Sequence, residues 1–172
     1  MSNVNDPKGL YPIRHLCGGV ISPSRYVMTA STTVFKGDVL KVVANGTVEP
    51  AAAGDGLIIV GVSAEYKVAP ATGITHVLVY DDPYIVFGVQ ANLHSGTVGQ
   101  ADVFATANHI VAAGSASTGL SGHQLNTSNI GTGAQLKIVG KIDTPDNDFG
   151  VNYVELCVIF NQHLYKAAVA GV

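Results

Sequence analysis

The sequence predicts an all-β protein, and three features of its composition support this fold class. The chain of 172 residues contains 24 valines, 11 isoleucines and 12 threonines, whose β-branched side chains are stiff at χ1 and pack well on pleated sheets. Lysine, arginine and glutamate, which normally cover helix surfaces, total only 12. Twenty glycines and seven prolines supply frequent turns. Short apolar segments alternate with these turn residues at the spacing of a β-sandwich or β-barrel.

Residues 1–26 differ from the rest of the chain and are predicted to form an extended N-terminal arm, followed by a body that spans residues 27–172. The segments 5–12 and 18–23 carry three prolines and three glycines without sustained periodicity, and proline removes a donor from a β-ladder. We therefore expect an arm that leaves the body, and not a strand pair. Its apolar residues require burial, against either a neighbouring molecule or the chain's own body.

Strands of the body are expected at about 39–44, 57–63, 75–80, 84–91, 135–142 and 153–162. Asn45-Gly46 is a strong hairpin signal, which predicts that residues 47–49 return beside the first of these strands. Residues 57–62 form a continuous apolar run, typical of a strand that is buried on both faces. Asp81-Asp82-Pro83 is expected to join its two flanking strands as a second hairpin.

Polar segments separate the later strands. Residues 99–108 could form one or two helical turns. Residues 114–133 are predicted to form a long surface loop, and loops of this length are usually functional or interfacial. Residues 143–150 are expected to form another exposed loop, between two strands.

Charge and hydropathy exclude several functional classes. The net charge is −3, and the sequence has no basic cluster that could grip nucleic-acid phosphates. The longest apolar runs, Leu57–Val62 and Leu156–Phe160, are far shorter than the roughly 18 residues of a membrane helix. The first seven residues do not resemble a signal peptide. With charged residues at 12% and a mean hydropathy of +0.32, we expect a chain that buries surface against protein partners, with no membrane or direct nucleic-acid partner.

Cysteine and histidine show none of the spacings that are typical of metal sites. Cys17 and Cys157 are expected to be free thiols, although a disulfide between them stays open. The six histidines are scattered, at His15, His76, His94, His109, His123 and His163.

The patterns of aspartate and serine predict neither a calcium-binding loop nor a catalytic serine. Asp143, Asp146 and Asp148 lack the glycine and closing glutamate of a calcium loop. Composition alone leaves a Ser/His/Asp triad open, but no Gly-x-Ser-x-Gly elbow occurs, since residues 118–122 have the wrong spacing. We therefore expect no enzyme, and no catalytic, metal-binding or cofactor-binding residue.

Six segments, in their order and spacing, resemble capsid decoration (cement) proteins of tailed bacteriophages, of the podovirus type. They are 6–16 (DPKGLYPIRHL), 35–39 (FKGDV), 80–90 (YDDPYIVFGVQ), 118–122 (TGLSG), 135–139 (QLKIV) and 144–150 (TPDNDFG). The ordered set carries the resemblance across nearly the whole chain. Gly88, where a larger side chain is expected, and residues 151–153 depart from the pattern.

The resemblance implies a β-barrel or β-tulip-like body and a homotrimer on the outer surface of the capsid of the virion, made in the host bacterial cytoplasm. The implied partners are the major capsid protein, other copies of the chain and neighbouring decoration proteins. The implied role is to bind the mature lattice and stabilise the head against DNA pressure. The interface residues expected from the arm and the 143–150 loop are Lys8, Leu10, Tyr11, Ile13, Arg14, His15, Leu16, Pro145, Asn147 and Phe149.

Two other functional classes stay open. A tail, fibre or receptor-binding module of the virion would share the all-β composition and the need for partners. Such a module would show repeats or an aromatic platform for sugars, and the chain has no tryptophan. A small trimeric all-β hydrolase is the enzymatic alternative.

Overall fold

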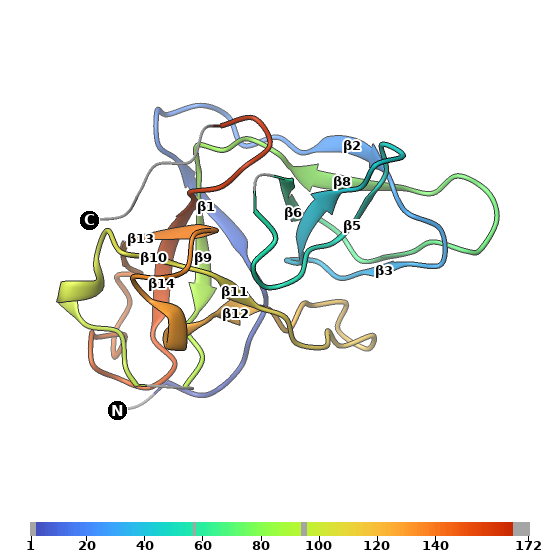
Figure 1. Cartoon of the computed structure of the whole chain (residues 1–172). Helices are drawn as coiled ribbons and strands as arrows, with labels where there is room; N and C mark the ends of the chain where they lie inside the picture. Colours follow the sequence, from blue (N-terminus) through green and yellow to red (C-terminus); the bar gives the residue numbers. More distant parts are fainter. Residues whose placement is uncertain (1–2, 57, 94–95, 167–172) are drawn as a thin grey trace.

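The computed structural model describes residues 3–56, 58–93 and 96–166 and confirms the all-β fold (Figure 1). Sheet A has the strand order β1 (Tyr11–His15), β9 (Ile85–Gln90), β14 (Glu155–Phe160), β13 (Leu136–Lys141) and β10 (Thr106–Ala107). Sheet B has the order β2 (Ser24–Val27), β8 (His76–Tyr80), β6 (Ile59–Ser63), β4 (Val39–Val42) and β5 (Val48–Pro50). Two small sheets pair β3 (Thr33–Val34) with β7 (Lys67–Val68) and β11 (His109–Ile110) with β12 (Gln124–Leu125).

Two hydrophobic cores lie on opposite faces of sheet B. The inter-sheet core joins sheet A to sheet B and contains Phe87 and Phe160, whose rings meet edge to face at 5.5 Å. The second core lies on the other face of sheet B, beneath the β3–β7 pair. Its members are Met28, Val34, Leu40, Val48, Val60, Ala69, Val77 and Val79. Sheet B is therefore the middle layer of the molecule.

The central strand β6 confirms the expected burial on both faces, because all five of its residues are buried. Ile59 and Val62 belong to the inter-sheet core, and Val60 belongs to the second core. Gly61 is required between them: its φ is +147°, and an added Cβ would lie 2.0 Å from the carbonyl oxygen of Tyr80. Leu57, at the start of the expected strand, lies outside the described residues. Ile58 corrects the expectation, because it lies in the turn before β6 and is 43% exposed.

Sheet B curls around the second core until its two edges approach each other. Thr29, which follows β2 closely, donates from its backbone N–H to the carbonyl of Val48 on β5, at 2.9 Å. One isolated bridge, between Met28 and Val48, joins the two edges. Because no ladder continues from this bridge, the described strands form a curled open sheet, and the expected barrel is not closed.

The strand positions expected from the sequence are confirmed, but one of the two expected hairpins is wrong. The Asn45-Gly46 turn does join β4 to β5. Asp81-Asp82-Pro83, however, does not form a hairpin, because β8 pairs within sheet B while β9 pairs within sheet A. These three residues instead carry the chain from one sheet to the other.

The polar segments are more ordered than expected. The helical elements of the described chain are two 3-10 turns, η1 (Gln100–Asp102) and η2 (Thr127–Asn129). Residues 121–125, within the expected surface loop, are buried and include β12. In the 143–150 loop, Asn147 is only 2% exposed because its side-chain amide bonds to the backbone of Ile142 and Glu155. This amide closes the loop between β13 and β14.

The extended arm is the main correction to the sequence analysis, because residues 11–15 form β1 and pair antiparallel with β9 at the edge of sheet A. Leu10, only 1% exposed, belongs to the inter-sheet core. Pro12 is accommodated because β1 is an edge strand, and a bulge interrupts the register between Pro12 and Arg14. Leu10 and Tyr11 thus pack against the chain's own body, whereas Ile13, Leu16 and Val20 of the same segment stay exposed.

The edge strand β1 also explains why position 88 is a glycine and not a larger residue. The Tyr11 ring lies across Gly88 on the neighbouring strand, and a Cβ added at Gly88 would lie 2.4 Å from the ring. The Tyr11 hydroxyl lies 3.4 Å from a carboxylate oxygen of Glu155. A side chain at position 88 would therefore displace Tyr11 from both contacts.

We predict that Gly88→Ala lowers the free energy of unfolding by about 1–2 kcal/mol, because the Tyr11 ring must move. Gly99→Ala is a matched control, since an added Cβ at Gly99 has its nearest heavy atom at 3.8 Å. Urea unfolding of Gly88→Ala, Tyr11→Ala and the double variant measures the coupling between the two sites. Additive effects in the double variant would contradict this explanation.

Candidate interaction surface

An exposed apolar surface lies at one end of the molecule, where three distant segments meet. We call it the end face and define it by Leu16, Val20, Tyr84, Leu164 and Tyr165. Val20 is 89% exposed and Tyr165 is 58% exposed. The β1–β2 loop, the turn before β9 and the segment after β14 come together at the top of Figure 1. Within the end face, the backbone N–H of Leu16 donates to the carbonyl of Tyr84 at 2.9 Å.

His15 and Asp82 hold the β1–β2 loop in place. The His15 ring accepts at Nδ1 from the backbone N–H groups of Cys17 (3.1 Å) and Gly19 (3.0 Å). Its Nε2 lies 2.9 Å from a carboxylate oxygen of Asp82, so Nε2 carries the ring proton. The other oxygen of Asp82 accepts from the backbone N–H of Tyr84 at 2.8 Å. Asp82 thereby positions two of the three segments of the end face.

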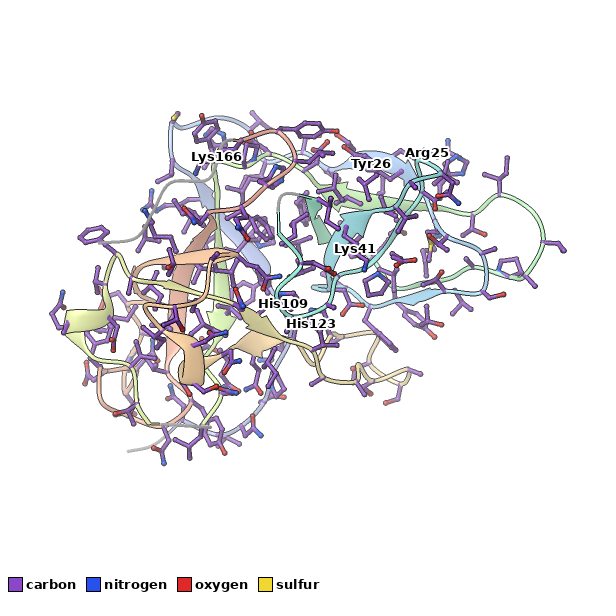
Figure 2. The ribbon with its side chains drawn as sticks, in the orientation of Figure 1. Arg25, Tyr26, Lys41, His109, His123 and Lys166 are labelled. Atoms are coloured by element: carbon purple, nitrogen blue, oxygen red, sulfur yellow. The ribbon has the colours of Figure 1, made fainter. Side chains whose placement is uncertain are left out.

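A second polar group positions the third segment. The hydroxyl of Tyr26 donates to Asp81 at 2.8 Å and lies 3.0 Å from the hydroxyl of Tyr165. Burial and these hydrogen bonds raise the pKa of Tyr26, which therefore stays protonated. Lys166 lies over the Tyr84 ring, 5.6 Å from its centroid, and Figure 2 shows Lys166 and Tyr26 along the same side of the molecule. The aromatic rings of the end face are held in fixed positions.

The end face has the properties of a protein-interaction surface. Exposed apolar and aromatic side chains that cluster together and are rimmed by polar groups mark such surfaces in soluble proteins. Aromatic rings that are already fixed lose little conformational entropy when a partner binds. The end face therefore suits the docking of another protein.

The arm residues expected at an interface divide into exposed and buried ones. Ile13 and Leu16 are each 40% exposed, and Arg14 is also exposed, at or next to the end face. Leu10 and Tyr11 are covered within the single chain, since Leu10 is in the core and Tyr11 is half-buried against Gly88. Burial, together with the Glu155 carboxylate, raises the pKa of Tyr11 to about 12.

The remaining expected residues lie away from the end face. Lys8 is paired with Asp6 at 3.3 Å. The 143–150 loop lies at the opposite end of sheet A, since it precedes Glu155, which pairs with Gln90 at the far end of β9. In this loop Pro145 is exposed, but Asn147 is buried and Phe149 packs against the inter-sheet core.

Sequence reasoning missed Tyr84, Leu164 and Tyr165. Tyr84 was assigned to a strand, and its exposure follows from a crossing between sheets that local patterns do not reveal. The polar and aromatic residues 163–166, directly after a strongly apolar strand, were a usable signal for a surface segment. Their position beside residue 16 follows only from the pairing of β14 with β9.

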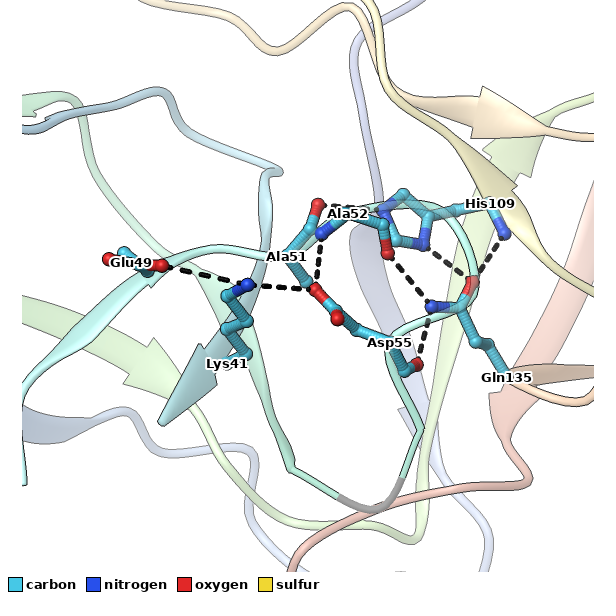
Figure 3. Close-up of polar contacts among 7 residues, drawn as sticks. All are labelled: Lys41, Glu49, Ala51, Ala52, Asp55, His109 and Gln135. Carbon is cyan, nitrogen blue, oxygen red and sulfur yellow. Dashed lines mark hydrogen bonds and ion pairs between the residues drawn. The ribbon is translucent and has the colours of Figure 1, made fainter. Parts of the chain in front are cut away.

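A buried polar cluster joins the two sheets at some distance from the end face (Figure 3). The Gln135 amide donates to the carbonyl oxygens of Ala52 (3.1 Å) and Asp55 (2.6 Å) in the segment after β5. The Gln135 side-chain oxygen lies 2.9 Å from Nδ1 of His109, and Nε2 of His109 lies 3.2 Å from the carbonyl oxygen of Ala51. These contacts fasten the entry of β13 in sheet A to the segment that follows β5 of sheet B.

Lys41 ends this cluster at the surface. Its ammonium lies 3.1 Å from a carboxylate oxygen of Asp55 and 3.5 Å from one of Glu49. The Asp55 hydrogen bond raises the pKa of Lys41, which therefore stays charged. A charged ammonium is not a nucleophile, so this trio acts as an ion-pair network.

Asp38, Ser121 and His123 lie together, but their geometry is not that of a catalytic triad. His123 accepts at Nδ1 from the backbone N–H of Val39 (3.3 Å), so its proton is on Nε2, which lies 3.5 Å from Asp38. The Ser121 hydroxyl oxygen accepts from the backbone N–H of His123 at 3.0 Å. No ring nitrogen of His123 can take a proton from Ser121, and all three residues are at most 3% exposed.

Acidification is expected to destabilise the fold, because burial lowers the pKa of three histidines, His109, His123 and His163, and so favours their neutral form. Burial lowers the pKa of His163 to about 4, and burial with the neighbouring His109 lowers that of His123 to about 3. In the unfolded chain the pKa of these groups is near 6.5, the ordinary value for histidine. From there down to their folded pKa values, the unfolded state takes up protons that the folded state excludes, so stability falls as the pH falls.

We predict a loss of about 2–4 kcal/mol in the free energy of unfolding between about pH 7 and about pH 5, measured by urea unfolding. Burial raises the pKa of Asp38, and this offsets part of the loss at the acidic end. His163→Gln is expected to reduce the slope, because it removes one group that is neutral only in the folded state. A free energy that does not change over this range would contradict the prediction.

Within residues 3–56, 58–93 and 96–166, no group of three or more His, Cys, Asp or Glu side chains could hold a metal ion. Both cysteines are free, and His94 lies outside the described residues. The described part of the chain has no helix long and apolar enough to cross a membrane. Comparisons of the chain with protein-family models, with curated proteins and with solved structures gave no match.

Proposed function

We propose that this protein is a non-enzymatic capsid decoration (cement) protein of a tailed bacteriophage. It binds as a trimer to the outside of the mature lattice of the major capsid protein and stabilises the head. The end face is the observation that carries the proposal, because it is a rigid apolar surface suited to a protein partner. The ordered resemblance of six sequence segments supports the major capsid protein as that partner.

The mechanism is differential binding. A protein that binds the mature lattice more tightly than its precursor or its broken form stabilises the mature lattice by mass action. No chemical step is involved, which suits a chain whose buried histidines and carboxylates hold structure. The low charge, 12% of residues, reduces the cost of removing charged groups from water at a repeated protein contact.

Tyr84 and Tyr165 are the side chains to test for lattice attachment. Aromatic residues at the centre of a patch carry much of the energy of an interface. We predict that Tyr84→Ser and Tyr165→Ser each weaken binding to expanded empty capsids by about 1–3 kcal/mol, or roughly 5- to 150-fold. Ile74→Ser is a matched control, since Ile74 is 76% exposed and lies outside the end face.

Sedimentation with washed capsids measures the binding, and electrophoresis of the pellet gives the occupancy. Wild-type protein that stays in the supernatant at every concentration would overturn the proposed function. If both tyrosine variants bind capsids as tightly as the wild type, the end face is not the surface that attaches to the lattice. Binding to tail fibres or to host cells, without binding to capsids, would favour the receptor-binding alternative.

A further inference from the structure

Phe104 combines an unfavourable backbone with an exposed aromatic side chain. It lies between η1 and β10, and its φ is +73°, in the left-handed region that bulky residues avoid. Its side chain is 54% exposed. Hydrogen bonds hold this conformation: the backbone N–H of Phe104 donates to Ile138 at 2.8 Å, and that of Ile138 donates to Ala105 at 3.0 Å. Within the single chain, this arrangement leaves more than half of Phe104 exposed.

A cavity of about 410 Å³ lies at the other edge of sheet A. Its apolar lining comes from both sheets and from a loop, and consists of Leu10, Tyr11, Pro12, Tyr80 and Leu120. Cavities of this size accept drug-sized ligands, and an aromatic side chain is smaller than these. The cavity is therefore large enough to receive a phenyl ring.

We call the Phe104 side chain the knob and the cavity the hole. The two cannot meet within one chain. Sheet A runs from β1 at one edge to β10 at the other. Tyr11 and Pro12 of β1 line the cavity, whereas Phe104 precedes β10 at the opposite edge. A second copy can bring the two together, and a contact between two different patches repeats from head to tail and closes into a ring when the rotation permits.

Charge at the two sites supports the same pairing. Lys8 and Lys36 line the cavity, together with Glu155, which is already engaged with the Tyr11 hydroxyl. Asp102 lies two residues before Phe104 and is partly exposed. Lys8 is also paired with Asp6, so Lys36 is the lysine at the cavity that forms no ion pair within the described part of the chain. Asp102 accepts from the backbone N–H of Gly99. The opposite charges of Asp102 and Lys36 favour one orientation of the pair.

We propose that Phe104 of one copy inserts into the cavity between Leu10 and Leu120 of the next copy, and that this contact closes the trimer. The inference rests on the proposed function for the number of copies in the ring. It also leaves the end face free for the capsid lattice. The strained backbone at Phe104 is then retained because it projects the ring toward the neighbouring copy.

Sedimentation velocity of the purified full chain tests the knob. We expect a concentration-dependent trimer for the wild type and about 30-fold or more weaker association for Phe104→Ala and Phe104→Gly. Glycine relieves the left-handed backbone, so the Phe104→Gly monomer should unfold at a temperature at least as high as the wild-type monomer, measured where both are dissociated. Val111→Ser, at a residue that is 48% exposed, is the control and should associate like the wild type.

A mixing experiment tests the hole. Leu120→Trp fills the cavity but keeps the knob, whereas Phe104→Ala removes the knob but keeps the cavity. Each variant alone should be monomeric, and an equimolar mixture should form a dimer through the single intact contact. Circular dichroism and thermal unfolding confirm that Leu120→Trp is folded; if it is not, the two Phe104 variants decide alone.

Each outcome separates this inference from the proposed function. Phe104 variants that associate like the wild type, or a wild type that stays monomeric, would overturn the knob-in-hole contact. If such a protein still binds capsids, the proposed function stands without the inference. If association depends on Phe104 but the protein never binds capsids, the inference stands and the proposed function falls.

Discussion

The burial of the central strands β4 and β6 on both faces of sheet B is the constraint on which the rest of the structure depends. Strands β4 and β6 send side chains into both cores, and a bulge in β6 places Val60 in one core and Val62 in the other. A shift of either strand by one residue would therefore disrupt both cores. Sheet A must cover one face, and the β3–β7 pair must cover the other. Gly61 shows how tightly this layer is built, because no side chain fits between β6 and the Tyr80 carbonyl. The low charge of the chain follows from the same demand for apolar surface.

The two edges of sheet A hinder pairing with another strand in different ways. At the β1 edge, Pro12 lacks a backbone donor and a bulge breaks the regular spacing, while the charged side chain of Arg14 is exposed. These features hinder the pairing of an edge strand with other chains. At the β10 edge the last strand has only two residues. Neither edge offers a long flat strand, which favours contacts with partners through side chains: the end face, the cavity and Phe104.

The buried polar groups complete the fold. Gln135 and His109 fasten the two sheets to each other, and His123 with Asp38 fastens the turn before β4 to the segment before β12. His109 and His123 stack with their ring centroids 5.0 Å apart, so a proton on one ring disfavours a proton on the other. Histidines that were scattered in the sequence thus converge as structural donors and acceptors. This convergence ties the stability of the sheet junction to pH.

The sequence by itself determined the fold class, most strand positions and the double burial of residues 59–63, because side-chain stiffness, alternation and turn chemistry act over a few residues. It did not determine which strands pair. Asp81-Asp82-Pro83 makes a turn, but whether the next strand returns to the same sheet depends on contacts formed elsewhere. The arm became β1 because Gly88 leaves room for Tyr11 on the edge of β9, and the end face exists only because β9 and β14 pair. Such contacts join residues that lie far apart in the chain, so only the tertiary structure decided them.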